Sequence, residues 1–276
     1  MKFKEKALFL QNNVQELNLT GFSNIYLGDE FCERLLPSID ELKNAINLCE
    51  HNKLKLTLVT PYLTDKGIDT LIQRVDFIIQ KELEYEIVIN DWGALSVLQN
   101  YYPDIRLVLG RILVSQYLSG YHAKFSGYES SLTNKKMNSH CNFPGSFISF
   151  LRENNISSLE FNRYQHLAAT QEQLKEFGFF SHIYYPFEYL TTSRYCAYVK
   201  SFPSYMHSAT QNCYKDCKKY IAVKKSKLVG RDVIIKGNTH FIKETKDLSQ
   251  LNCAIDRIIY NDFLSFPHQS ESEIIE

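Results

Sequence analysis

The sequence has no surplus of charge of either sign. Lys and Arg together number 31, and so do Asp and Glu. Binding to nucleic acids or to membrane surfaces usually depends on a basic surface, so the overall charge supports neither function. The densest basic run, KDCKKYIAVKKSK from Lys215 to Lys227, is typical of a solvated strand edge or loop. We therefore expect neither a nucleic acid nor a membrane among the partners.

Long apolar runs are also absent. The N-terminal stretch MKFKEKALFLQNN holds a single short apolar run, ALFL, whereas a secretory signal needs ~7 to 15 apolar residues. No segment reaches the ~18 uninterrupted apolar residues of a membrane span. We expect a cytoplasmic protein, whose cysteines stay reduced and serve as free thiols or as metal ligands.

Several common functional motifs are missing. No G-x-G-x-x-G or G-x4-G-K-[ST] follows a predicted strand, which removes the main reason to expect a nucleotide-binding open sheet. None of the eight histidines forms H-x3-H or H-E-x-x-H, so a histidine-rich zinc site is not expected. A protease needs a nucleophile, a base and an orienting group, and no G-x-S-x-G motif or family-type cysteine signature points to them.

Short apolar runs alternate with helical patterns along most of the chain. The helix expected at 38–52 has a capping-box signal, because Ser38 is followed three residues later by Glu41. The predicted strands are 24–29, 55–61, 85–91, 105–111, 157–162 and 179–187, and the other predicted helices are 66–83, 93–102, 145–154 and a short one near 170–176.

This βα repeat predicts a parallel sheet, either in a TIM-like barrel, complete or incomplete, or in a doubly wound open sheet. The missing nucleotide motifs favour the barrel. We assign residues 1–220 to the barrel domain. Residues 221–276 are expected to form a small β-rich extension that packs on it, with strands near 220–225 and 232–244 followed by a helix at 248–264.

The cysteines give the strongest chemical signal. Four of the seven form a spaced set, one early and three late, with the last two as C-x3-C: Cys32, Cys196, Cys213 and Cys217. A soft metal centre needs three or four thiolates, although this pattern is neither the ferredoxin run nor the paired knuckles of a zinc ribbon. Cys32 and Cys196 follow predicted strands, and the loops at the carboxyl ends of parallel strands converge on one face.

The other three cysteines have different surroundings. Cys49 and Cys253 fall within predicted helices and are interpreted as buried structural thiols. Cys141 lies in a loop beside His140, where it is either a spare ligand or an ordinary loop residue.

Polar residues at the predicted strand ends are the candidate catalytic groups. Asp91 has an alternative role as a helix cap, and Arg111 as a structural ion-pair partner. Four aromatic residues either line a pocket for a ring-bearing substrate or belong to the barrel core: Trp92, Tyr184, Tyr185 and Tyr189. The predicted catalytic set is Asn90, Asp91, Arg111, Glu160 and Arg194.

A family resemblance follows from six segments that occur in order between residues 24 and 220: IYLGDEFCERLL, VINDWGALSVL, LVLGRIL, SSLEFNRYQHLA, YYPFEYLTTSRYC and NCYKDC. Together they resemble the collagenase-like peptidase family U-32, in particular its short iron-sulfur members UbiU and UbiV of anaerobic ubiquinone biosynthesis. The resemblance implies that Cys32, Cys196, Cys213 and Cys217 bind a 4Fe-4S cluster.

The resemblance also implies a function, which is oxygen-independent hydroxylation, or a related redox modification, of a small metabolite, either aromatic or not. It further implies a related partner subunit in a heterodimer. The sequence leaves four alternatives open. These are a noncatalytic cluster-bearing subunit, a peptidase, an RNA-modifying protein and a zinc-stabilised binding module.

Overall fold

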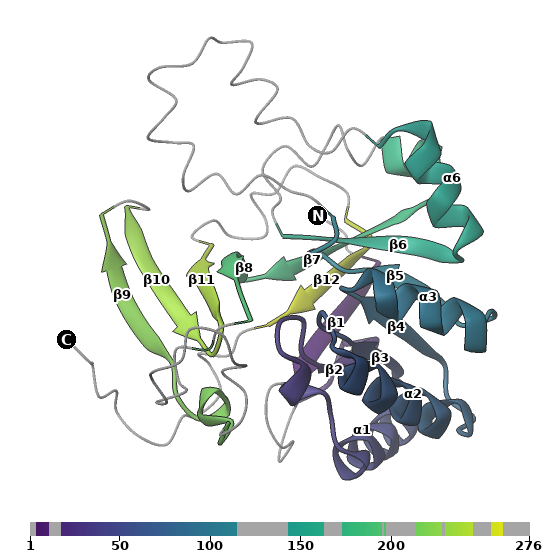
Figure 1. Ribbon diagram of the computed structural model, residues 1–276, viewed down its shortest axis with the longest axis horizontal. Coiled ribbons are helices and arrows are strands. Elements are labelled where there is room, and N and C mark those ends of the chain that lie inside the picture. Colours follow the sequence, from purple (N-terminus) through teal and green to yellow (C-terminus); the bar gives the residue numbers. More distant parts are fainter. Residues whose placement is uncertain are drawn as a thin grey trace.

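The computed structural model describes residues 4–10, 18–114, 143–162, 173–194, 196, 213–227, 230–244 and 255–261. These residues form a closed barrel of parallel strands with helices on its outside and, beside it, a four-stranded antiparallel sheet (Figure 1). Within these ranges, no helix has the length and apolar character needed to cross a bilayer.

The barrel has eight strands in the closed order β1-β12-β7-β6-β5-β4-β3-β2, and every neighbouring pair is parallel. The predicted TIM-barrel-like α/β fold is therefore confirmed, and the barrel is complete. Its strands are β1 (Glu5–Leu10), β2 (Asn24–Gly28), β3 (Lys55–Val59), β4 (Tyr85–Ile89), β5 (Leu107–Leu109), β6 (Ile156–Phe161), β7 (Phe180–Tyr185) and β12 (Arg257–Tyr260).

Three of the helices on the outside begin at a residue whose side chain caps them. Helix α1 (Ile39–Asn52) begins with the capping box, in which the Ser38 hydroxyl accepts from the Glu41 backbone N–H and the Glu41 carboxylate accepts from that of Ser38. Thr64 caps α2 (Asp65–Ile79) and Asp91 caps α3 (Trp92–Tyr101). The remaining long helix is α6 (Gly145–Glu153).

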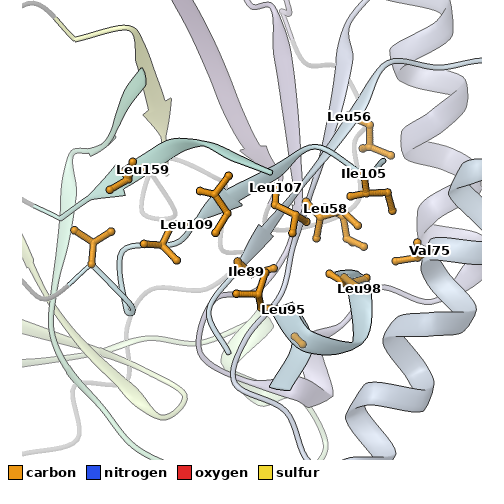
Figure 2. Close-up of a cluster of buried hydrophobic side chains, with 14 of the residues drawn as sticks. Leu56, Leu58, Val75, Ile89, Leu95, Leu98, Ile105, Leu107, Leu109 and Leu159 are labelled. Carbon is orange, nitrogen blue, oxygen red and sulfur yellow. The ribbon is translucent and has the colours of Figure 1, made fainter. Parts of the chain in front are cut away.

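The main hydrophobic core lies between the strands and these helices (Figure 2). Leu56 and Leu58 of β3 belong to it, while Val59 belongs to a second cluster with Val88 and Val108. Parallel barrel strands are buried on both faces, because one face packs on helices and the other fills the barrel. This explains why the strands read as nearly continuous apolar runs.

Two barrel strands differ from the sequence-based expectation. β1 was not predicted, and the helix expected at 248–264 is wrong at residues 257–260, which form β12 between β7 and β1. Ile258 joins the outer core and Ile259 the inner cluster, so both faces of β12 are buried. A short run that is apolar on both faces cannot be told from a buried helix segment by periodicity.

The second sheet confirms the predicted β-rich region and extends it. Its strands are β8 (Phe187–Thr192), β11 (Thr239–Lys243), β10 (Arg231–Lys236) and β9 (Ala222–Ser226), in that order and all antiparallel. β8 comes before the predicted boundary at residue 220, and β12 comes after it. The chain therefore crosses from the barrel to the second sheet after β7 and returns to the barrel through β12.

Candidate functional site

A pocket at the carboxyl ends of the barrel strands brings together the four spaced cysteines, Cys32, Cys196, Cys213 and Cys217. Cys32 precedes a short 3-10 helix, η1 (Glu33–Leu35), that follows β2, and Cys217 lies in a second one, η3 (Asp216–Lys218). The remaining walls come from barrel strand ends, from the segment around Arg194 and from the β10–β11 turn. The convergence expected from the strand ends is thus present, despite the long sequence separation of Cys32 from the other three.

None of the four cysteines is in a disulfide, and Cys217 is buried whereas Cys32, Cys196 and Cys213 are partly exposed. Burial raises the pKa of Cys32 to about 12, and the carboxylate of Asp29 and the neighbouring thiols act in the same direction. Burial likewise raises the pKa of Cys217 to about 12. Cys32 and Cys217 are therefore protonated at neutral pH, because burial disfavours the charged thiolate.

The described residues contain no group of three or more His, Cys, Asp or Glu side chains arranged to hold a metal ion. The four thiols thus share a cavity without forming a site for a single ion. Of the remaining cysteines, Cys49 lies fully buried in the outer core, as predicted, and Cys141 and Cys253 lie outside the described residues.

Asp29 fixes the loop that carries Cys32. Its Oδ1 accepts from the backbone N–H groups of Phe31 at 2.7 Å and Cys32 at 2.8 Å. Burial raises the pKa of Asp29 to about 6, although these hydrogen bonds oppose the shift. On the other wall, burial lowers the pKa of Lys236 to about 8. Both charged groups line the pocket.

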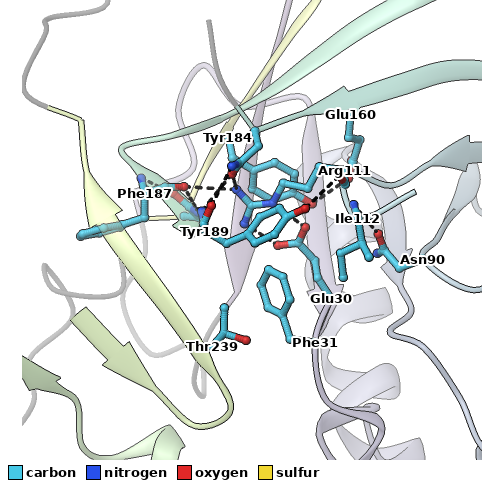
Figure 3. Close-up of polar contacts among 12 residues, drawn as sticks. Glu30, Phe31, Asn90, Arg111, Ile112, Glu160, Tyr184, Phe187, Tyr189 and Thr239 are labelled. Atoms are coloured by element: carbon cyan, nitrogen blue, oxygen red, sulfur yellow. Dashed lines mark hydrogen bonds and ion pairs between the residues drawn. The ribbon is translucent and has the colours of Figure 1, made fainter. Parts of the chain in front are cut away.

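Arg111 lies at the floor of the pocket in a buried ion pair (Figure 3). Its Nε and Nη2 donate to the two carboxylate oxygens of Glu30, each at 2.7 Å. Its Nη1 donates to Asn162 Oδ1 at 3.0 Å, and the guanidinium lies 3.8 Å from the centre of the Tyr184 ring. The bidentate pair therefore joins β5 to the loop after β2, which is the structural role that the sequence left open for Arg111.

Glu160 is inside the barrel and is not among the residues that line the pocket. Its Oε2 accepts from the Tyr184 hydroxyl at 2.8 Å, while its buried Oε1 has no hydrogen-bond partner. Burial raises the pKa of Glu160 to about 8, and the charge of Glu30 adds to the effect. The carboxyl group is therefore mostly protonated at neutral pH.

Asn90 and Asp91 lie at the predicted end of β4 but make structural hydrogen bonds. Asn90 Nδ2 donates to the Thr60 carbonyl at 2.9 Å. Asp91 accepts from the backbone N–H of Ala94 at 2.9 Å and of Leu63 at 3.2 Å, so it is the cap of α3. Neither residue lines the pocket.

Arg194 does line the pocket, and its guanidinium lies 5.3 Å from the centre of the Tyr62 ring. The four aromatic residues proposed for the substrate do not line it. Trp92 is 45% exposed on α3 and packs on Phe150, and Tyr184 belongs to the cluster inside the barrel. For Tyr184 the barrel-core alternative is thus the correct one.

Several lining residues were missed by the sequence reasoning, among them Asp29, Glu30, Arg34, Lys236 and Asn238. Asp29 and Glu30 follow β2 directly, so the strand-end rule that selected Asn90 could have selected them. The Gly237–Asn238 pair is a recognisable hairpin turn, but its packing at the barrel mouth depends on tertiary structure.

The fold and the pocket together define an α/β-barrel protein with four cysteines around a cavity at the barrel mouth. No protein-family model and no curated protein matches the sequence. Among solved structures, the chain is similar to a protein described as copper homeostasis protein CutC from Streptococcus agalactiae, with 12% identity and a TM-score of 0.43 over 66% of this chain and 88% of that chain.

Proposed function

We propose that the chain is an iron-sulfur protein of the U-32 type and that Cys32, Cys196, Cys213 and Cys217 hold a 4Fe-4S cluster. The observation that carries the proposal is that these cysteines, chosen from the sequence alone, line one pocket. Their donor chemistry fits, because four thiolates are the usual ligands of such a cluster. The thiolates of a cluster bond to different irons, so they need not converge on one point as the ligands of a single ion do.

A 4Fe-4S cluster supplies one-electron transfer, and the reaction we propose is oxygen-independent hydroxylation, or a related redox modification, of a small metabolite. Asp29 would hold the Cys32 loop in place through its two backbone hydrogen bonds. Arg111 and Glu30 would keep the pocket floor rigid and neutral in charge. Arg34 and Arg194, which also line the pocket, would be available to a negatively charged substrate.

The peptidase alternative has less support. Among the described residues, those that line the pocket include thiols but no histidine, which is the usual base of a cysteine protease. The proposed setting is the cytoplasm, where the thiols stay reduced, with a related subunit as the partner.

The test is anaerobic reconstitution with iron and sulfide, followed by measurement of bound iron and of the broad absorption near ~400 nm. The wild-type protein is expected to become brown, and Cys32→Ala and Cys213→Ala to lose most of the iron. Cys49→Ala is the matched control, because Cys49 is a buried thiol in the outer core, away from the pocket lining. Full iron retention in the Cys32→Ala, Cys213→Ala double variant would refute the ligand assignment.

The reaction needs its own measurement. Deletion of the gene is expected to remove one hydroxylated metabolite under anaerobic growth, and Cys196→Ala is expected to reproduce that loss. A protein that needs the cluster only to fold would instead be the noncatalytic subunit. Hydrolysis of denatured collagen or casein by a variant without all four cysteines would establish the peptidase function.

A further inference from the structure

The turn between β10 and β11 consists of Gly237 and Asn238, and the Asn238 side chain forms hydrogen bonds with residues at the barrel mouth. The Asn238 Nδ2 atom donates to the Phe31 carbonyl at 2.7 Å and to the Ser193 carbonyl at 2.6 Å, and it lies 2.9 Å from the Tyr62 hydroxyl. The Asn238 backbone carbonyl accepts from the Ser193 N–H at 3.2 Å. One side chain thus joins three segments of the chain.

The Tyr62 hydroxyl closes this group of hydrogen bonds by donating to the same Ser193 carbonyl at 2.6 Å. An amide nitrogen has two hydrogens, so its three neighbouring oxygens share them. A hairpin needs a Gly-Asn pair only for its backbone geometry. The bonds to Phe31 and Ser193 therefore serve something other than the turn itself.

The preceding residue, Gly237, lies against a cysteine. It has a φ of +62°, in the left-handed region, and a Cβ atom at this position would lie 3.3 Å from Cys217 Cβ and 3.5 Å from Cys217 Sγ. Glycine therefore serves two purposes, since it adopts this backbone conformation without strain and lets the turn approach the thiol.

These contacts reach three of the four cysteines. Phe31 directly precedes Cys32, Ser193 lies three residues before Cys196, and a Cβ atom at Gly237 would lie 3.3 Å from Cys217 Cβ. Gly237 and Asn238 themselves line the pocket. Within the described residues, the turn thus links the early cysteine loop to the segments that carry two of the late cysteines.

We propose that the β10–β11 turn positions the cysteines, with Asn238 holding the Cys32 and Cys196 segments at a fixed separation and Gly237 forming the wall against Cys217. Asn238 is a positioning residue, because it acts through the backbone that carries the thiols. The identity of the group that the thiols hold rests on the proposed function, whereas the positioning of the thiols does not.

The first test measures the thiols without any bound group. The metal-free protein is treated with iodoacetamide under native conditions, and the modification of each cysteine is followed by mass spectrometry. Asn238→Ala is expected to raise the rate at Cys32 and Cys196 by about tenfold, as the loss of several hydrogen bonds loosens both segments. Asn238→Asp is expected to do the same, because its carboxylate would face carbonyl oxygens.

The matched control is Asn154→Ala. The Asn154 side chain also donates to a carbonyl, that of Phe150 at 2.8 Å, but it lies at the end of α6 and outside the pocket lining. Its modification rates should equal those of the wild type. Equal rates in Asn238→Ala and Asn154→Ala would overturn the proposal, and so would an Asn238→Asp variant that behaves like the wild type.

Tyr62→Phe provides a milder variant if the changes at Asn238 prevent folding. It removes one hydroxyl and keeps the ring, and it should raise the rate at Cys196 by about threefold with a smaller effect at Cys32. An unchanged rate at Cys196 in this variant would contradict the shared group of hydrogen bonds at Ser193.

The second test uses the reconstituted protein in air. Loss of iron from Asn238→Ala and from Gly237→Ala should be about tenfold faster than from the wild type or Asn154→Ala. If the wild type binds no iron, the proposed function fails and the alkylation rates still decide the positioning. If the wild type binds iron but the Asn238 variants match the control in both tests, the positioning fails and the proposed function stands.

Discussion

Buried charged and titratable side chains occupy the interior of the barrel among the described residues. Arg111 pairs with Glu30 at the mouth, and Arg257 pairs with Glu86 near the other end. Glu160 lies inside the same barrel with one oxygen unpartnered. Both arginines are already paired with carboxylates, Arg257 with Glu5 as well as with Glu86. An ionised Glu160 would therefore be an uncompensated buried charge.

This arrangement makes stability depend on pH through Glu160. Its pKa is raised from 4.5 to about 8 by burial, so between these values the folded protein holds a proton that the unfolded chain has released. The free energy of unfolding should therefore fall as the pH rises from about 4.5 to about 8, by up to about 1.4 kcal/mol per pH unit. Urea unfolding of wild type and Glu160→Gln at several pH values measures this contribution.

The Glu160→Gln variant should lose this slope, because an amide does not titrate, and should keep a hydrogen bond from Tyr184. Identical pH profiles for the two proteins would contradict the raised pKa.

The Arg111–Glu30 pair gives a second prediction. Arg111→Met leaves the buried Glu30 carboxylate without its partner and should lower the free energy of unfolding by about 3 to 5 kcal/mol. The double variant Arg111→Met, Glu30→Gln removes the uncompensated charge and should recover a large part of this loss. Urea unfolding of both variants checks the result, and a double variant as unstable as Arg111→Met would show that packing, not charge, dominates.

The site residues differ in how far the sequence could reveal them. Cysteines stand out because few residue types bind soft metals, and their places after strands were enough to predict one shared pocket. Polar residues at strand ends are ambiguous, because the same position also suits a cap or an ion pair. Asp91 and Arg111 have these structural roles, and only the three-dimensional contacts could show it.

At the scale of helices and strands, the capping and the periodicity of the sequence predicted most of the barrel. The capping box of Ser38 and Glu41 is present as predicted, and the alternating strands and helices from β2 to β7 follow the expected order. β1 and β12 were not recognised, because neither is followed in the described residues by a helix that would complete a βα unit. Their pairing with each other depends on contacts between the two ends of the chain.

The cap of α3 can be separated from a catalytic role by experiment. Asp91→Ala should lower the free energy of unfolding by about 1 kcal/mol, because it removes the acceptor for two backbone N–H groups. Asp91→Asn should cost less, since asparagine is also a good cap. Urea unfolding gives the stabilities, and iron content after reconstitution should match the wild type in both variants. A large loss of iron with little loss of stability would restore Asp91 to the candidate site.

At the scale of the whole molecule, the pocket depends on the chain returning to the barrel. The cysteines, Arg111 and the β10–β11 turn are far apart in sequence and meet only because the second sheet is inserted between β7 and β12. The sequence predicted a barrel and a β-rich region but placed them one after the other. Local patterns do not record which strand closes a barrel, because closure depends on pairing between distant segments.

The insertion leads to a prediction about the fragment of residues 1–220, the barrel domain expected from the sequence. This fragment lacks β12, so β1 and β7 lose the strand that pairs with both of them. It also lacks Arg257, which leaves Glu86 buried without its cationic partner. Open strand edges aggregate readily, and the fragment should be insoluble or unfold without a cooperative transition, whereas the full chain unfolds cooperatively.

Co-expression with residues 221–276 should restore soluble protein by supplying β12. Thermal unfolding followed by circular dichroism distinguishes these outcomes. If the fragment of residues 1–220 shows a cooperative transition close to that of the full chain, β12 is not needed to close the barrel.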